Sequence, residues 1–96
     1  NPLLKDLSLN PIYPNPFNSE SSISFYLPLK SMVDVSIIDV SGQFVVQLIN
    51  EIKPKGNHSI KWDGKNKMGY EVTSGLYFSV LKIDGYLLKR KMILLK

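Results

Sequence analysis

The residues spaced best for chemistry lie in one loop, Asp63-Gly64-Lys65-Asn66-Lys67-Met68-Gly69. A calcium loop needs oxygen ligands at alternate positions and an acidic residue that closes the coordination shell. Lys65 and Lys67 occupy positions where oxygens would be required. The loop is therefore predicted to be a tight turn, in which Asp63 accepts hydrogen bonds from backbone amides and the glycines take positive φ.

Catalysis and metal binding need partners that this sequence does not supply. His58 is the only histidine and cysteine is absent, which excludes a two-histidine zinc site, a thiolate site and a disulfide within the chain. We expect His58 to pack inward beside Ile60 on a strand. The hydroxyls and acids are scattered, with no base near the serines and no glycine loop that would bind phosphate. No enzyme activity, cofactor or metal is predicted. The residues considered are Ser19, Ser21, Ser22, Ser24, Asp34, Asp39, Asp63, Asp84, Glu20, Glu51 and Glu71.

Size and composition predict one folded domain, because 96 residues fall below the roughly 150 that one domain typically takes. The net charge of +4 comes from lysines spread over turns and strand positions, which favours solubility over nucleic-acid binding. Every apolar run is far shorter than the roughly 20 residues that cross a bilayer, so no membrane insertion is expected. Asn1-Pro2 is an implausible natural start, and we expect the chain to come from the end of a longer protein.

Proline and alternation divide the chain into short elements. Residues 1–10 are predicted to be a linker and the start of a first strand, with Leu7 and Leu9 alternating. Three prolines between positions 11 and 16 exclude a helix or a central strand and predict a rigid corner. Tyr13 and Phe17 are expected to pack there as apolar anchors, while Asn15 and Asn18 close local turns.

The remaining pattern is typical of β-structure. Apolar residues alternate with polar ones around Val35 and Phe25, the single tryptophan Trp62 is expected to face inward, and Asp84-Gly85 is a strong hairpin signal. A loop or crossover is predicted over residues 50–57. With no helical pattern, the fold class is all-β, a single immunoglobulin-like β-sandwich of about seven antiparallel strands. Beyond the first strand, the expected strands cover residues 22–27, 33–37, 44–49, 58–62, 75–83 and 86–95.

Five elements follow one another along the chain: an opening from Tyr13 to Asn18, a turn at Gly42, a turn from Trp62 to Gly64, a G-x-Y element from Gly75 to Tyr77, and a basic, apolar terminus from Lys89 and Arg90 to Lys96. In this order they resemble the type A C-terminal sorting domain of the type IX secretion system, also called the Por system. The immunoglobulin-like C-terminal domain of the flagellar hook-capping protein is similar, and shares the opening and the G-x-Y element. The resemblance assigns residues 11–96 to the sorting domain. The predicted sorting-motif residues are Tyr13, Pro14, Asn15, Pro16, Phe17, Asn18, Gly42, Gly75, Leu76, Tyr77, Lys91, Met92, Ile93, Leu94, Leu95 and Lys96.

The resemblance implies a non-catalytic signal that directs a Sec-exported cargo across the outer membrane to the cell surface or the medium, by way of the periplasm. The implied partners are the upstream cargo domain and the translocon, shuttle and sortase proteins, and a surface sortase would remove the domain. We expect the last strand, from Lys91 to Lys96, to pair through its edge with a receptor. Met92 and Leu94 would face inward, and an unpaired edge could promote dimerisation.

An extracellular adhesive, spacer or carbohydrate-binding module of a larger secreted enzyme remains the alternative. A sugar-binding platform would need several exposed rings. Trp62 and Tyr77 are expected to be buried, which leaves Tyr70 and Tyr86 in or beside turns. Two rings are weak support for such a platform.

Overall fold

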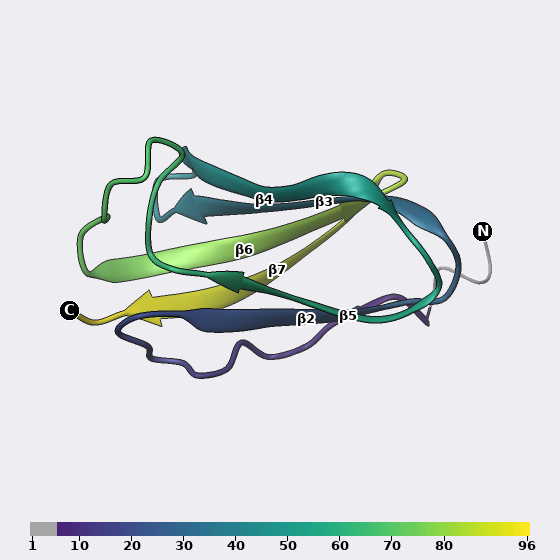
Figure 1. Ribbon diagram of the computed structural model, residues 1–96, viewed down its shortest axis with the longest axis horizontal. Helices are drawn as coiled ribbons and strands as arrows, with labels where there is room; N and C mark the ends of the chain where they lie inside the picture. Colours follow the sequence, from purple (N-terminus) through teal and green to yellow (C-terminus); the bar gives the residue numbers. More distant parts are fainter. Residues whose placement is uncertain (1–5) are drawn as a thin grey trace.

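The computed structural model describes residues 6–96 as two antiparallel sheets packed face to face (Figure 1). One sheet has the strand order β1-β2-β5 and the other has the order β4-β3-β6-β7. This arrangement confirms the predicted immunoglobulin-like sandwich. No helix in this part of the chain is long and apolar enough to cross a membrane. The strands are β1 (Ser8–Leu9), β2 (Ser21–Leu27), β3 (Ser31–Asp39), β4 (Phe44–Lys53), β5 (Gly56–Trp62), β6 (Gly75–Ile83) and β7 (Tyr86–Leu94).

Strict alternation in β2 and β3 produces the centre of the core. Successive side chains of a strand point to opposite faces of its sheet, so every second residue can be apolar and buried. The buried set includes Ile23, Phe25 and Leu27 of β2 and Val33, Val35 and Ile37 of β3. The alternation expected for both strands is confirmed.

Trp62 lies at one end of the core between two other aromatic rings. Its ring makes edge-on contacts with Phe17, at a centroid distance of 5.7 Å, and with Tyr77, at 5.2 Å. The buried polar groups of these rings are satisfied, since the Trp62 Nε1 donates to the carbonyl of Lys65 and the Tyr77 hydroxyl donates to that of Thr73. The expected inward orientation of Trp62 and Tyr77 is confirmed.

β6 and β7 form the predicted hairpin. Asp84 and Gly85 both have positive φ, 46° and 84°, as a two-residue turn of the primed type requires. Met92 and Leu94 are fully buried in β7, as their spacing predicts. The hairpin pairs one edge of β7 with β6.

The crossover between sheets predicted over residues 50–57 is present, but it is shorter than expected. β4 continues to Lys53, and only Pro54 and Lys55 separate it from β5. The strand persists because β3 offers a pairing partner along its whole length, with Ser31 opposite Lys53. His58 then faces inward as expected: its ring stacks on Phe25 at 5.5 Å.

The loop after Trp62 is the tight turn that its sequence predicts. The Asp63 Oδ1 accepts from the Lys65 amide at 3.1 Å, and the Asn66 Oδ1 accepts from the amides of Met68 and Tyr70. Gly64 has a φ of 76° and Gly69 one of 85°. Residues 6–96 contain no group of three or more His, Asp or Glu side chains that could hold a metal ion.

Candidate functional site

Residues 13–18, the proline segment, connect the two sheets on one side of the sandwich. At its start, Tyr13 pairs with Ser22 of β2 through backbone bonds of 3.3 and 2.8 Å. At its end, the Phe17 amide donates to the carbonyl of Ile93 at 2.9 Å, and the Leu95 amide donates to the carbonyl of Phe17 at 2.8 Å. The segment thus pairs with β2 in one sheet and with β7 in the other.

Asn15 adds a side-chain bridge to the same edge. Its Nδ2 donates to the carbonyl of Lys91 at 3.0 Å, and its Oδ1 accepts from the amide of Ile93 at 2.9 Å. A carboxamide carries a donor group and an acceptor atom side by side, so it can satisfy two outward backbone groups of a strand edge. The expectation that Asn15 closes a local turn is therefore wrong.

The two expected aromatic anchors behave differently. Phe17 is only 4% exposed and packs against Trp62, whereas Tyr13 is 79% exposed. Residues paired across antiparallel strands point to the same face, and Ser22, the partner of Tyr13, does not face the core. The anchor role holds for Phe17 and is wrong for Tyr13; the buried neighbour Ile12 takes the inward position.

The last residues of the chain are bound on both sides. Gly75 and Leu94 are paired partners of β6 and β7, while the proline segment occupies the outer side. Beyond β7, the Lys96 amide donates to the Ser74 hydroxyl at 2.9 Å. The side-chain Nζ of Lys96 lies 3.4 Å from the Glu71 carboxylate. The last strand is therefore not an open edge between Lys91 and Leu95. The expectation that it is offered for backbone pairing is wrong for the folded chain.

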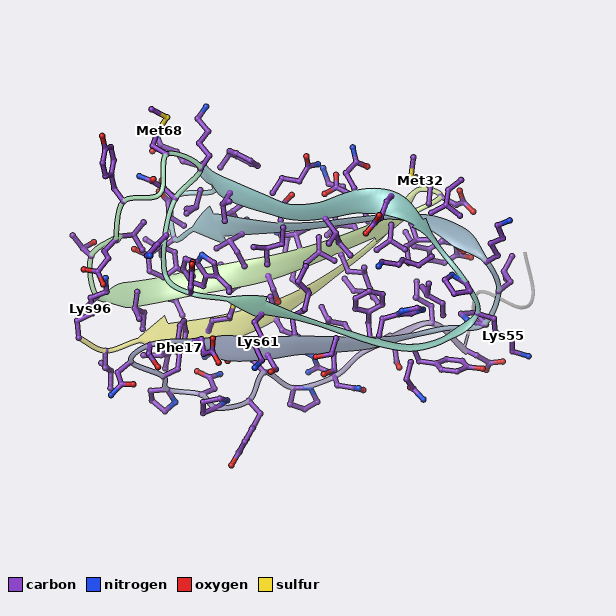
Figure 2. All side chains as sticks on the ribbon, viewed as in Figure 1. Phe17, Met32, Lys55, Lys61, Met68 and Lys96 are labelled. Carbon is purple, nitrogen blue, oxygen red and sulfur yellow. The ribbon has the colours of Figure 1, made fainter. Side chains whose placement is uncertain are left out.

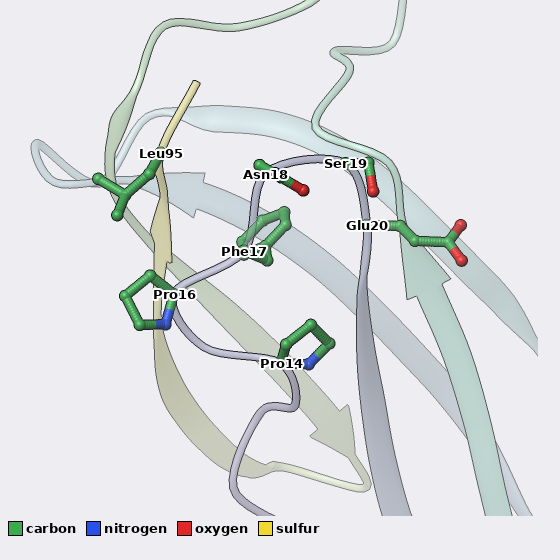
Figure 3. Close-up of a pocket in the computed structure, with 7 residues that line it drawn as sticks. All are labelled: Pro14, Pro16, Phe17, Asn18, Ser19, Glu20 and Leu95. Atoms are coloured by element: carbon green, nitrogen blue, oxygen red, sulfur yellow. The ribbon is translucent and has the colours of Figure 1, made fainter.

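A shallow hollow of about 360 Å³ lies where the proline segment meets the chain end (Figure 3). Figure 3 shows Leu95 and Pro16 on one side of it and Ser19 and Glu20 on the other. The hollow also involves Pro14, whose carbonyl accepts a hydrogen bond from the Ser21 hydroxyl. Side chains from both ends of the chain thus form one surface. Its lining residues are Pro14, Pro16, Phe17, Asn18, Ser19, Glu20 and Leu95.

The G-x-Y element lies beside this surface. Leu76 pairs with Ile93, and Tyr77 pairs with Met92. The expected turn at Gly42 is present, and Gly42 has a φ of 87°. This turn follows β3, whose last residue Asp39 pairs with Tyr77, so it lies at the same end of the sandwich but on the far side of β6.

Asp39 organises the Gly42 turn, a role that the sequence analysis missed. Its Oδ1 accepts from the Ser41 hydroxyl at 2.7 Å and from the amides of Ser41 and Gln43 at 2.9 Å. These hydrogen bonds, led by that of the Ser41 side chain, hold the pKa of the Asp39 carboxyl below its usual value. An Asp two residues before Ser and three before Gly is the signal that could have identified it.

The geometry defines an immunoglobulin-like domain whose N-terminal segment holds its last strand. Residues 12–83 match the model of the FlgD Ig-like domain, and the chain belongs to that family. The domain of this family is non-catalytic. No curated protein matches this chain.

Solved structures share this fold. PorU from Porphyromonas gingivalis, in its dimeric latent form, superposes with a TM-score of 0.72 at 23% identity over 93% of this chain. PorZ, an essential surface component of the type IX secretion system of the same bacterium, gives 0.63 at 19% identity over 98%. FlgD from P. aeruginosa gives 0.61 at 25% identity over 92%. The chain spans only 9% of PorU and 12% of PorZ, and 64% of FlgD.

Proposed function

We propose that this domain is a C-terminal sorting signal that directs a Sec-exported cargo across the outer membrane by the type IX system. One observation carries the proposal. The proline segment and the end of the chain are the most distant parts of the predicted motif, and they form a single surface through Asn15 and Phe17. A receptor would then read a folded surface rather than a flexible tail.

Two further findings support the proposal. The chain has the fold of a domain found in PorZ, a component of the type IX system. It also belongs to the family of the FlgD Ig-like domain, the second family that its motifs resemble. At these identities the likeness to PorZ shows fold alone. The proposed partners are the translocon, the shuttle and sortase proteins and the upstream cargo, with removal by the sortase at the cell surface.

The receptor contact is proposed to use side chains, because the backbone edge from Lys91 to Leu95 is already occupied. Leu95 is 54% exposed at the rim of the hollow, and Pro14 and Pro16 present rigid apolar rings there. The hollow combines these apolar side chains with the polar residues Asn18, Ser19 and Glu20, so it suits a protruding side chain of a partner that also carries a hydrogen-bonding group. Recognition would then require the domain to be folded.

The test is a Sec-targeted fluorescent reporter that carries residues 1–96 at its C-terminus, in a bacterium with a type IX apparatus. Surface or medium delivery that stops when the translocon is disabled is expected. Leu95→Ser should reduce delivery while the domain stays folded. Ile52→Ser is the matched control, because Ile52 is 59% exposed on β4, away from the hollow.

Periplasmic retention of a folded reporter fusion would overturn the proposal. It would favour the adhesive, spacer or carbohydrate-binding module, and titration of the domain with glycans would test the last of these. Equal delivery of the Leu95→Ser and unchanged domains would instead overturn the role of the hollow.

A further inference from the structure

The sheet β4-β3-β6-β7 has an apolar strip on the face that points away from the core. In a two-layer sandwich the outer face of an antiparallel sheet is normally polar. Tyr77, Leu81 and Ile83 of β6 are buried on the inner face. By alternation, the outer face of β6 carries Leu76 and Phe78, followed by Val80.

Neighbouring strands extend this strip to both sides. Ile38 of β3 pairs with Phe78, and Ile93 of β7 pairs with Leu76. All four are half-buried, and Val80 is only 5% exposed. The outer strip, defined as Ile38, Leu76, Phe78, Val80 and Ile93, is therefore a set of adjacent apolar side chains over three strands.

Lysines flank the outer strip along β7. Lys91 pairs with Phe78 and Lys89 pairs with Val80, and both side chains are exposed. Lys82 lies one step further along β6. The ion pairs found within residues 6–96 involve other lysines, Lys53, Lys61 and Lys96. On the β7 side, the strip thus lies beside cations that no carboxylate of the described chain neutralises.

We propose that the outer strip docks an amphipathic helix of a partner protein, with carboxylates along the flank that meets Lys89 and Lys91. The strip from Leu76 to Val80 is about 13 Å long at roughly 3.3 Å per strand residue, which matches about nine residues of helix. A helix about 10 Å wide covers two strands spaced roughly 4.8 Å apart. The carboxylate flank follows from charge complementarity. This inference does not depend on the sorting function.

Charge and shape favour this occupant over two others. A second copy that docked through its own outer strip would bring the lysines Lys89 and Lys91 of both copies to the same interface, where like charges repel. A membrane surface calls for apolar side chains that protrude into the lipid. Phe78 is half-buried within the sheet face, so it presents a platform rather than a wedge.

The test is an NMR titration of the 96-residue chain with two synthetic helical peptides. Both carry one leucine face; the flank of the first is glutamate and that of the second is lysine. Binding of the glutamate peptide should shift resonances of β6, β7 and Ile38 while those of β2 and β5 stay unchanged. Lys89→Glu combined with Lys91→Glu should weaken it about tenfold and should strengthen binding of the lysine peptide.

Lys65→Glu combined with Lys67→Glu is the matched control, since it reverses two exposed lysines at the same spacing in a loop and should leave binding unchanged. Equal binding of both peptides, or shifts centred on β2 and β5, would overturn the proposal. So would shifts of the outer strip that grow with protein concentration alone, which indicate a second copy. Adsorption to phosphatidylglycerol vesicles through Lys89 and Lys91, without peptide binding, would overturn it in favour of a membrane surface.

Discussion

The two sides of the sandwich are closed in different ways. On the β2 and β7 side, the proline segment pairs with both sheets, and the residues that meet there are 76 and 78 positions apart in the chain. On the β4 and β5 side, the two edge strands are joined in sequence by Pro54 and Lys55, and a loop amide, that of Lys67, donates to the carbonyl of Val45 at 3.2 Å. In Figure 1 the proline segment runs below β2 toward the chain end.

The opening and closing elements of the predicted motif thus meet on the β2 and β7 side, where distant parts of the chain pair. Asn15 and Phe17 hold β7 through hydrogen bonds to Lys91, Ile93 and Leu95. The opposite edge is protected by local features: β4 has two irregularities opposite β3, next to Val35 and Ile37, and irregular edges pair poorly with other chains. The side chains of both sides are drawn in Figure 2. Dimerisation through an edge stays a prediction.

The largest expected effect comes from removing residues 92–96. Met92 and Leu94 are fully buried, and losing a buried side chain of this size costs about 2–5 kcal/mol, against a total stability of roughly 5–15 kcal/mol for a domain. We expect the truncated chain to be unfolded, as measured by circular dichroism and NMR dispersion. Removing Lys96 alone should leave the fold intact. A folded truncated chain would contradict the account.

Phe17→Ala should destabilise the closed side strongly. Phe17 is 4% exposed and contacts Trp62, so a loss of about 3 kcal/mol in the free energy of unfolding is expected. Phe44→Ala is the control at the start of β4, where the ring is 54% exposed, and it should cost less than about 1 kcal/mol. Urea denaturation measures both, and equal losses would remove the proposed difference between the two sides.

Asn15→Ala should cost about 1–2 kcal/mol, because two hydrogen bonds to β7 are lost at an exposed site. Asn18→Ala is the matched control in the same proline segment, where the structure records no side-chain hydrogen bond for it within residues 6–96. It should change the free energy of unfolding by less than about 0.5 kcal/mol. If both variants cost the same, the bridge from Asn15 contributes nothing specific.

The smallest effect concerns the Gly42 turn, away from the closed side. Hydrogen bonds from Ser41 and Gln43 lower the pKa of Asp39, so their contribution to stability is complete above the unfolded pKa of about 3.9 and is lost as the pH falls through the lower folded pKa. Ser41→Ala should raise the pKa of Asp39 in an NMR titration. Ser36→Ala, which removes a donor to Asp34 and not to Asp39, should leave the pKa of Asp39 unchanged.

Local patterns were sufficient to predict most of the fold. The alternation at Val33, Val35 and Ile37 identified β3, and Asp84-Gly85 identified the hairpin, because both signals depend on residues close in sequence. The family resemblance placed Asn15, Phe17 and Leu95 in one predicted motif, and the structure brings these residues together at one edge. The sequence therefore predicted which elements exist and, in most cases, which face they bury.

Contacts between distant residues could not be predicted in this way. Nothing near Asn15 indicates that its carboxamide meets Lys91 and Ile93, and a local turn is the usual role of Asn beside proline. The orientation of Tyr13 depends on its pairing with Ser22, which only the folded sheet defines. The extension of β4 through residues 50–53 likewise depends on the length of β3.

Amide hydrogen exchange in β7 tests the central claim, that the proline segment holds the last strand. The amides of Ile93 and Leu95 donate outward to Asn15 and Phe17. Alternate amides of a strand point to opposite edges, so those of Met92 and Leu94 face β6. The account predicts that Asn15→Ala accelerates exchange at Ile93 much more than at Met92 and Leu94. Rapid exchange at Ile93 and Leu95 in the unchanged chain, or no difference in the variant, would contradict it.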